Sequence, residues 1–319
     1  MSEARNLYDR GLKYAELNDH EKAAESFKKA IELEPDCHQA HSELGYALGN
    51  LDQYDDALES FEKALKINNS PSALYGQGLT FYYMNDFTRA VDSFQKVLEM
   101  DESEWAYYYL SRCYFNLGDQ TKALDALEKS LAINQDFMEA WNDQGVIFSI
   151  LGEDEKALKS FEQVLRINPN YLPAVYNLGT TLADMGHYEE ALQCLDRILE
   201  QEPDNFKALF YKGNILFLLR KGEEALDLFE KALKVDPNHP EAWNYQGCVL
   251  ASMGDAEGAE KSLQNAIRLY PEYEAALMNL GVVYRGLDKM DEARECFEKV
   301  IHINPDNEEV IKEMGELDK

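Results

Sequence analysis

The sequence predicts an all-α fold, a solenoid of about nine helix-turn-helix repeats, and three periodic features support it. Alanine recurs at spacings of 33 or 34 residues: Ala23, Ala57, Ala90, Ala123, Ala157, Ala191, Ala225, Ala259 and Ala293. Glycine lies twelve residues before each of these alanines, except in the fourth repeat, which has Ser111 there. Phe or Leu lies four residues after each alanine. Self-similarity at a fixed period of this size is the signature of a solenoid, so one repeated structure is expected throughout.

Each repeat is predicted to contain two helices joined by a short turn. In the fifth repeat, Trp141, Gly145 and Phe148 fall on one face of the first helix at helical spacing. Ala157 and Phe161 do the same on the second helix, and the turn between the helices carries the sequence LGEDEKA. The repeated glycine and alanine are expected where the two helices cross, because small residues allow backbones to approach closely.

The chain is predicted to form a single domain, 1–319, in which the repeats follow one another without linkers. Their expected bounds are 4–37, 38–70, 71–103, 104–137, 138–171, 172–205, 206–239, 240–273 and 274–307. Proline cannot continue a helix interior, so prolines near the repeat boundaries support this division. They are Pro35, Pro169, Pro203, Pro237, Pro271 and Pro305.

The last segment, 308–319, is predicted to be a capping half-repeat. Its Ile311, Met314 and Leu317 have the spacing of one helix face and are expected to cover the last exposed part of the core. The charged residues between them would then face water, as the terminal repeat of a solenoid requires.

The 34-residue period, with its pattern of Gly, Tyr, Ala, Phe and Pro, resembles the tetratricopeptide repeat family. The segment 139–170, EAWNDQGVIFSILGEDEKALKSFEQVLRINPN, is a close instance, and the resemblance covers nearly the whole chain. Membership would imply antiparallel helix pairs stacked into a right-handed superhelix. The first helix of each repeat would then line a concave groove.

The stretch EWAYYYLSRCYF, 104–115, has six aromatic residues in twelve positions, more than the core of one helix needs. The repeat pattern places four of its residues in the core: Tyr107, Leu110, Ser111 and Tyr114. It places five on the face that, by the resemblance, lines the groove: Trp105, Tyr108, Tyr109, Arg112 and Phe115. Tyr and Trp are enriched at interfaces because they combine an apolar ring with a polar group. These residues therefore either bind a partner or pack against neighbouring first helices.

The same face carries aromatic and asparagine residues in other repeats. They are Tyr75, Tyr82, Asn142, Tyr176, Asn177, Phe210, Tyr211, Asn214, Asn244, Tyr245 and Asn279. An asparagine amide can pair with the backbone of an extended peptide, and aromatic rings supply apolar contact beside it. We expect the partner to lie between repeats three and seven. The expected anchors are Tyr108, Tyr109, Tyr176, Asn177, Tyr211 and Asn214.

Family members that hold the acidic C-terminal tails of chaperones use a Lys-x-x-x-Asn, an Asn and a Lys-x-x-x-Arg on successive first helices. The matching positions here are Tyr8, Leu12, Glu43, Ser72 and Gly76, so that clamp is absent. Carboxylates outnumber cations on the same face. A neutral or basic partner segment is therefore expected rather than an acidic tail.

Composition excludes other classes of partner. The net charge of −29 disfavours binding to nucleic-acid phosphates and to anionic membranes. No apolar run approaches the roughly 20 residues that span a bilayer, and the beginning, MSEARNLYDR, has no apolar signal-peptide core. A cytoplasmic protein is expected. Five scattered cysteines, with no CxxC, predict reduced thiols.

The sequence predicts no enzymatic activity, no cofactor and no metal site. It has no dinucleotide-binding or phosphate-binding glycine motif, no HExxH and no GxSxG. His38 and His41 have the spacing of two ligands on one helix face, but two ligands do not make a metal site.

Three functions remain open at this point. The first is a scaffold whose groove binds an extended peptide or helix of another protein. The second is a module that self-associates into a homo-oligomer through its terminal helices. The third is an RNA reader, since other helical repeats read bases, but the acidic charge and the lack of a basic stripe count against it.

Overall fold

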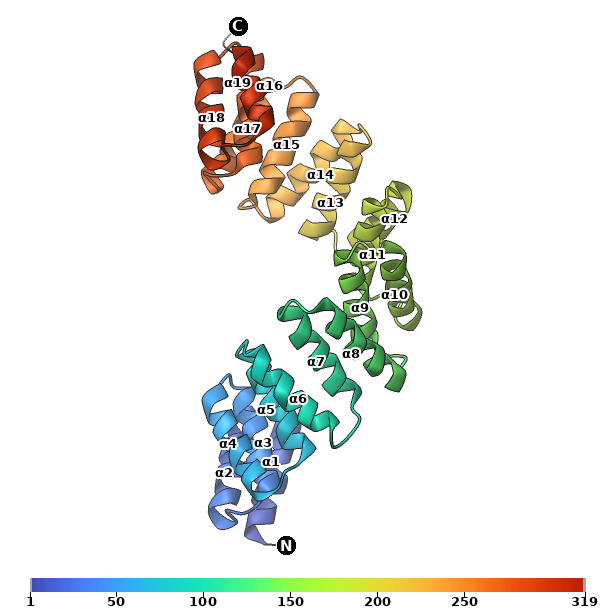
Figure 1. The fold of residues 1–319 in the computed structure, drawn as a ribbon, viewed down its shortest axis with the longest axis vertical. Helices are drawn as coiled ribbons and strands as arrows, with labels where there is room; N and C mark the ends of the chain where they lie inside the picture. The colour runs from blue at the N-terminus through green and yellow to red at the C-terminus, as the bar shows by residue number, and fades with distance from the viewer. Residues whose placement is uncertain (1, 318–319) are drawn as a thin grey trace. The chain divides into compact units, whose positions relative to one another are not determined.

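The computed structural model describes residues 2–317. These residues form nineteen helices and no strand, which confirms the predicted all-α class (Figure 1). The first helices of successive repeats are α1 (Glu3–Glu16), α3 (His38–Gly49), α5 (Pro71–Tyr83), α7 (Glu104–Asn116), α9 (Met138–Ile150), α11 (Leu172–Asp184), α13 (Phe206–Leu218), α15 (Pro240–Ser252) and α17 (Glu274–Gly286). The second helices are α2 (His20–Leu33), α4 (Tyr54–Ile67), α6 (Phe87–Leu98), α8 (Gln120–Ile133), α10 (Asp154–Ile167), α12 (Tyr188–Gln201), α14 (Gly222–Val235), α16 (Ala256–Leu269) and α18 (Met290–Ile303). The last helix is α19 (Glu308–Leu317).

The turn between the two helices of each repeat contains one residue with a left-handed backbone. These residues, with φ between 57° and 86°, are Asn18, Asp52, Asn85, Gly118, Gly152, Gly186, Arg220, Gly254 and Asp288. Gly, Asn and Asp tolerate this conformation best, which explains the composition of the turns. In several repeats the second helix then starts at an aspartate cap, as where the Asp119 side chain accepts a hydrogen bond from the backbone N–H of Lys122.

The chain divides into two compact units, the first ending at Glu153 and the second beginning at Asp154. Unit 1 contains α1 to α9, and within it every helix packs against the next one along the chain. Its first helices also contact each other directly, α1 with α3, α3 with α5 and α5 with α7. Unit 2 contains α10 to α19 and is built in the same way, with direct contacts between α11 and α13, α13 and α15, and α15 and α17. In each unit the first helices therefore share one face.

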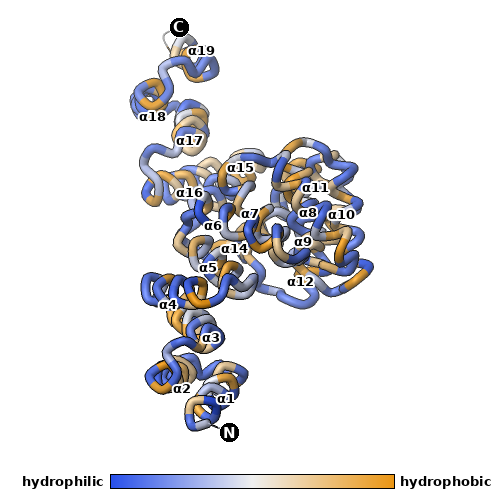
Figure 2. The backbone as a smooth tube through the Cα atoms, turned by 60° about the horizontal axis from the view of Figure 1, so that its bottom comes forward, coloured by the Kyte–Doolittle hydropathy of each residue, from blue (hydrophilic) through white to orange (hydrophobic). Residues whose placement is uncertain are grey.

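The core of each unit is a series of phenylalanine or leucine side chains set against small residues. Figure 2 shows apolar and polar residues sharing the turns of the helices, as expected when one face of a helix is buried. A Cβ added to Gly11 would lie 2.5 Å from Cε1 of the buried Phe27, so glycine is required there. The fourth repeat differs, because it has Ser111 in place of the glycine and Leu127 where most repeats have phenylalanine. Ser111 is buried, and its hydroxyl donates to the carbonyl oxygen of Tyr108 at 2.8 Å.

The final helix, α19, covers the core with a different residue from the one expected. Val310 is fully buried, whereas Ile311 is 52% exposed, so the prediction that Ile311 covers the core was wrong. Met314 and Leu317 do pack against the core of unit 2. The buried face of α19 therefore begins one residue earlier than the spacing suggested. Residues 318–319 of the predicted cap lie outside the described residues.

Candidate binding face on the first helices

Tyr109 is the centre of an aromatic cluster in unit 1. Its ring stacks on that of Phe94, with centroids 5.8 Å apart and planes at 17°. It meets the rings of Tyr75, Tyr82 and Tyr108 edge-on, at 6.1, 5.5 and 5.4 Å. Burial raises the pKa of the Tyr109 hydroxyl to about 12. These rings join α5, α6 and α7, so much of the aromatic stretch packs between neighbouring repeats.

Trp105 lies at the edge of this cluster and remains 45% exposed. Its ring contacts Phe137 at 4.5 Å and Tyr108 at 6.0 Å. Phe137 stands in the turn before α9 and was not singled out from the sequence. Trp105 therefore presents a ring that is held on one side and open on the other.

Tyr108 does not lie on an open face, contrary to the sequence prediction. Its side chain is 6% exposed and belongs to the core, because Phe137 covers it at a ring distance of 5.0 Å. Burial raises the pKa of its hydroxyl, and the hydrogen bond to the Asp143 carboxylate on α9 acts in the same direction. Tyr108 therefore packs in the core beneath the candidate binding face and is not itself open to a partner.

The predicted core residues of α7 divide in a similar way. Leu110 and Ser111 are buried as expected. Tyr107 and Tyr114 are only half-buried, and the Tyr114 hydroxyl accepts a hydrogen bond from Gln95 Nε2 at 3.0 Å. The buried side of α7 is therefore rotated towards Tyr108.

Arg112 borders a pocket of about 230 Å³ between α5, α7 and α9. Its guanidinium carbon lies 5.4 Å from the ring centroid of Tyr82 and 5.8 Å from that of Tyr108. Its Nε is 3.8 Å from Oδ2 of Asp143. Burial raises the pKa of the Asp143 carboxyl, and the Arg112 charge opposes that shift. The remaining walls are both apolar and polar: Ser111, Phe115, Asn116, Val146 and Ile147.

Unit 2 carries a second aromatic cluster with similar geometry. The ring of Tyr245 stacks on Phe229 at 5.9 Å and 16°. Phe210 meets Tyr245 at 5.6 Å and Tyr211 at 5.7 Å. Tyr211 also meets the ring of Tyr176 at 5.5 Å and is 39% exposed. Most of these rings are held by one another, and Tyr211 presents the largest open surface among them.

The asparagines predicted to bind a peptide have different surroundings. Asn244 is buried, and its Oδ1 accepts a hydrogen bond from Nδ2 of Asn279 at 2.9 Å. The expectation that Asn244 is open to a ligand was therefore wrong, because contact between α15 and α17 pairs the two amides. Asn142 donates to Oδ1 of the neighbouring Asp143 at 3.5 Å. Asn214 is half-buried, and its buried Oδ1 has no hydrogen-bond partner among the described residues.

The predicted groove residues fall into two groups, one in each unit. Unit 1 holds Tyr75, Tyr82, Trp105, Tyr108, Tyr109, Arg112 and Asn142. Unit 2 holds Tyr176, Asn177, Phe210, Tyr211, Asn214, Asn244, Tyr245 and Asn279. The six expected anchors are divided between the two groups. Of these, Tyr108 is buried, and Tyr109, Tyr176, Asn177 and Asn214 are half-buried.

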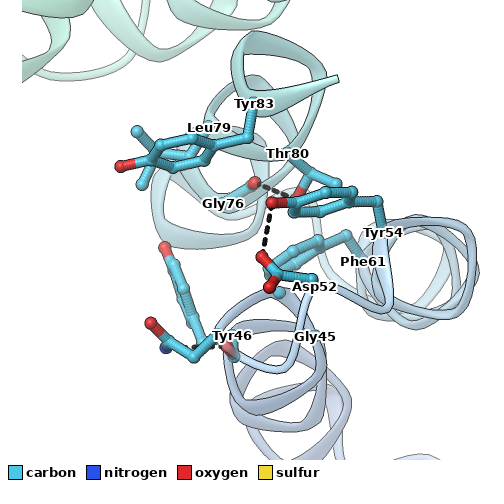
Figure 3. A pocket seen from close by; sticks show the side chains of 11 residues that line it. Gly45, Tyr46, Asp52, Tyr54, Phe61, Gly76, Leu79, Thr80 and Tyr83 are labelled. Carbon is cyan, nitrogen blue, oxygen red and sulfur yellow. Dashed lines mark hydrogen bonds between the residues drawn. The ribbon is translucent and has the colours of Figure 1, made fainter. Parts of the chain in front are cut away.

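A second pocket in unit 1, of about 210 Å³, was not found from the sequence. It lies against α3, α4 and α5, where Gly45, Gly49 and Gly76 leave space (Figure 3). The sequence interpretation treated such glycines only as packing positions. Gly76 could have indicated this pocket from the sequence. It is a glycine at the repeat position where the next repeat has the large residue Tyr109.

Neither a metal centre nor a membrane span is found in the described part of the chain. Within residues 2–317, no group of three or more His, Cys, Asp or Glu side chains is placed to hold a metal ion. The two histidines of the HxxH pattern face different partners. His41 Nε2 lies 2.8 Å from the carbonyl oxygen of Pro35, and His38 Nε2 lies 3.3 Å from Nδ2 of Asn68. No described helix is both long and apolar enough to cross a bilayer.

Comparison with known families agrees with the repeated helix pairs. Family models described as tetratricopeptide repeat match five stretches: residues 8–73, 138–171, 176–242, 228–261 and 275–307. The chain belongs to the tetratricopeptide repeat family. A model described as anaphase-promoting complex, cyclosome, subunit 3 also matches residues 50–130 of this tetratricopeptide repeat protein. The comparison with curated proteins found no significant match.

Several solved tetratricopeptide repeat structures are similar to this chain. YrrB, described as a tetratricopeptide repeat protein with an unusual peptide-binding site, is 29% identical, with a TM-score of 0.51 over 59% of this chain and 98% of its own. A protein from Parabacteroides merdae is 17% identical, with a TM-score of 0.59 over 77% of this chain and 98% of its own. The C-terminal part of a protein from Cytophaga hutchinsonii is 16% identical, with a TM-score of 0.60 over 75% of this chain and 98% of its own. The last two support the fold alone.

Proposed function

We propose that this tetratricopeptide repeat protein is a non-catalytic scaffold that binds an extended or helical segment of a partner protein along its first helices. The pocket beside Arg112 carries the proposal. It combines an aromatic face on Tyr82, an apolar wall on Val146 and a charged group on Arg112. Interfaces concentrate their binding energy where aromatic and arginine side chains meet in such hollows. The peptide-binding site described for YrrB supports the same use of the fold.

Trp105 extends this site beyond the pocket. Its ring is held by Phe137 and Tyr108, yet 45% of the residue is exposed. A ring already held in place loses little conformational freedom on binding, so its apolar contact contributes more of its energy to affinity. Trp105 and Arg112 are therefore the anchors we assign in unit 1.

We assign a neutral or basic character to the partner segment. Arg112 is the cation among the pocket residues, and its Nε already lies 3.8 Å from the Asp143 carboxylate. The chain as a whole carries a net charge of −29. An acidic segment would be repelled by this field and would have to compete with Asp143 for Arg112.

Unit 2 offers a smaller site of the same kind. Tyr211 exposes part of its ring beside Tyr176, and Asn214 lies one turn along α13. The buried Oδ1 of Asn214 lacks a partner among the described residues. Because this oxygen is buried, a bound peptide could reach it only if neighbouring side chains moved, so Tyr211 is the anchor that we assign in unit 2.

Selection of displayed peptides tests the proposal even while the partner protein is unidentified. A library of random twelve-residue peptides would be selected on the full chain, and the affinities of the recovered peptides would be measured by calorimetry. The test variant carries Trp105→Ala and Arg112→Ala. We expect it to lose about 2 kcal/mol of binding, roughly thirtyfold in affinity, as the truncation of central anchors does.

A matched control carries Arg268→Ala and Tyr270→Ala at the end of α16. It removes the same charge and an aromatic residue that is 50% exposed, on a second helix of unit 2. Circular dichroism melting checks that both variants fold. Recovered peptides that bind the test variant and the control equally well would refute binding beside Arg112. Light scattering of the peptide-free chain separates this function from self-association.

A further inference from the structure

The pocket of about 210 Å³ in unit 1 is surrounded by four aromatic rings, two from first helices and two from a second helix. Figure 3 shows Tyr46 and Tyr83 on one side of the space, with Tyr54 and Asp52 across from them. The buried ring of Phe61 forms the floor and meets Tyr46 at 5.1 Å and 80°. An enclosure of ring faces favours a cation, because each face carries negative electrostatic potential.

A carboxylate completes the enclosure. Oδ1 of Asp52 accepts a hydrogen bond from the Tyr54 hydroxyl at 2.6 Å, which fixes the acid beside the rings. The residues that line the pocket include no lysine or arginine. Glu43 lies one turn before Tyr46 on α3, and its carboxylate has an electrostatic effect on Tyr46. Asp52 is therefore the acid that lines the pocket, and Glu43 stands outside its lining.

The space itself exists because glycine occupies three of the wall positions. A Cβ at Gly76 would lie 2.4 Å from the Phe61 ring, so this glycine allows the ring to form the floor. Gly49 is different, because a Cβ added there would have no atom within 4 Å. Nothing in the packing of unit 1 therefore requires glycine at position 49, and a larger side chain there would enter open space.

We propose that this pocket binds one lysine or arginine side chain of a partner segment. The aliphatic stem would lie on Phe61 and Leu79, and the cation would reach the Asp52 carboxylate among the rings. The inference rests on the proposed function, since it names a side chain that the partner would supply. It concerns a pocket that shares no residue with the one beside Arg112.

Short peptides with one variable residue test this inference directly. Pentapeptides acetyl-Gly-Ser-X-Ser-Gly-amide, with X as lysine, arginine, norleucine or glutamate, would be titrated into the isotope-labelled full chain. Backbone amide shifts of Gly49, Asp52 and Gly76 would be followed by NMR. We expect saturable shifts with lysine and arginine, and at least fivefold weaker binding of norleucine, which keeps the stem without the charge. The glutamate peptide should leave these amides unshifted.

Two substitutions link the shifts to the pocket. Asp52→Asn keeps a residue that tolerates the left-handed backbone, with φ of 58° here, and removes the charge. It should weaken lysine binding about fivefold and leave norleucine binding unchanged. Gly49→Leu fills the space and should abolish the lysine shifts. Asp288→Asn is the matched control, because Asp288 also has φ of 58° at the same place in the ninth repeat.

The outcomes separate this inference from the proposed function. Equal binding of lysine and norleucine, an unchanged affinity in Asp52→Asn, or shifts that Asp288→Asn weakens equally would each overturn the cation pocket. The absence of any shift would do so too. In each of those cases, selected twelve-residue peptides whose affinity depends on Trp105 and Arg112 would still establish the scaffold function. Conversely, the lysine pentapeptide could shift the Gly49 amide while the selection recovers no peptide that depends on Trp105 and Arg112. The cation pocket would then stand, and the site beside Arg112 would be refuted.

Discussion

The ring of Tyr109 lies flat against the ring of Phe94, with centroids 5.8 Å apart and planes 17° apart. Tyr109 belongs to the first helix of one repeat, and Phe94 belongs to the second helix of the repeat before it. Unit 2 contains the same relationship between Tyr245 and Phe229, at 5.9 Å and 16°. An aromatic residue at this position of a first helix therefore joins consecutive repeats as well as facing the candidate site.

A double-mutant cycle on Tyr109 and Phe94 should reveal coupling between the two rings. Each would be replaced by Leu, singly and together, and unfolding in urea would be followed by tryptophan fluorescence. Ring pairs contribute about 0.5–1.5 kcal/mol beyond the area they bury, so the coupling free energy should fall in that range. Tyr245 and Phe229 should give a similar value. Tyr109 combined with the distant Phe27 should be additive, and equal coupling there would contradict a direct ring contact.

Alanine substitution of two glycines should change stability in opposite directions. Gly76→Ala places a Cβ 2.4 Å from the Phe61 ring and should lower the free energy of unfolding by about 1–3 kcal/mol, as overpacking does. Gly49→Ala meets no atom within 4 Å and should raise it by about 0.5–1 kcal/mol, because alanine favours a helix over glycine. Urea unfolding measures both. Destabilisation by both substitutions would show that the pocket beside Gly49 has no room.

Replacing Asp143 with Asn should change the dependence of stability on pH. Burial raises the pKa of Asp143, so the folded chain keeps this proton at pH values where the unfolded chain has lost it. The resulting stability is fully present below the ordinary pKa of about 3.9 and is lost as pH rises through the raised folded value. Asn cannot ionise, so the stability of Asp143→Asn relative to the wild type should increase between pH 4 and pH 7.

Asp119, whose carboxyl pKa is shifted in the opposite direction, provides the control for this measurement. Hydrogen bonds from Lys122 lower the pKa of Asp119, so its contribution is present above the ordinary pKa and is lost in acid. Asp119→Asn should therefore lose stability relative to the wild type as pH rises towards 4, and should change little between pH 4 and pH 7. Parallel behaviour of the two variants would mean that a general charge effect, rather than the burial of Asp143, governs the result.

Truncation of two adjacent residues in α19 should identify its buried face. Val310 is fully buried and Ile311 is 52% exposed. Val310→Ala should cost about 1–2 kcal/mol through lost burial, and Ile311→Ala about 0.5 kcal/mol or less. Urea unfolding followed by the fluorescence of Trp243 would measure both. A larger cost for Ile311→Ala would restore the face that the sequence spacing suggested.

The sequence was sufficient to predict the helix pairs and the small-to-large contacts between them. Those features depend on neighbours within one repeat, and the same spacing recurs throughout the chain. The surroundings of Tyr108 and Asn244 could not be predicted in this way. Each is buried by a residue outside its own helix pair: Phe137, in the turn that leads to α9, covers Tyr108, and Asn279 on α17 lies beside Asn244. The pocket beside Gly49 was missed for the same reason, because its rings come from three helices.

The small-to-large contact within the helix pairs of each unit also constrains which residue pairs can replace one another. Serine opposite phenylalanine is excluded, because a Cβ at Gly11 would lie 2.5 Å from the Phe27 ring. The fourth repeat has Ser111 and Leu127 at these two positions, and both are buried. A leucine does not by itself make room for a side chain at the glycine position, since a Cβ at Gly247 would lie 2.7 Å from Cγ of Leu263. The glycine–phenylalanine and serine–leucine pairs therefore act as matched units, because changing the large residue to leucine does not by itself free the small position.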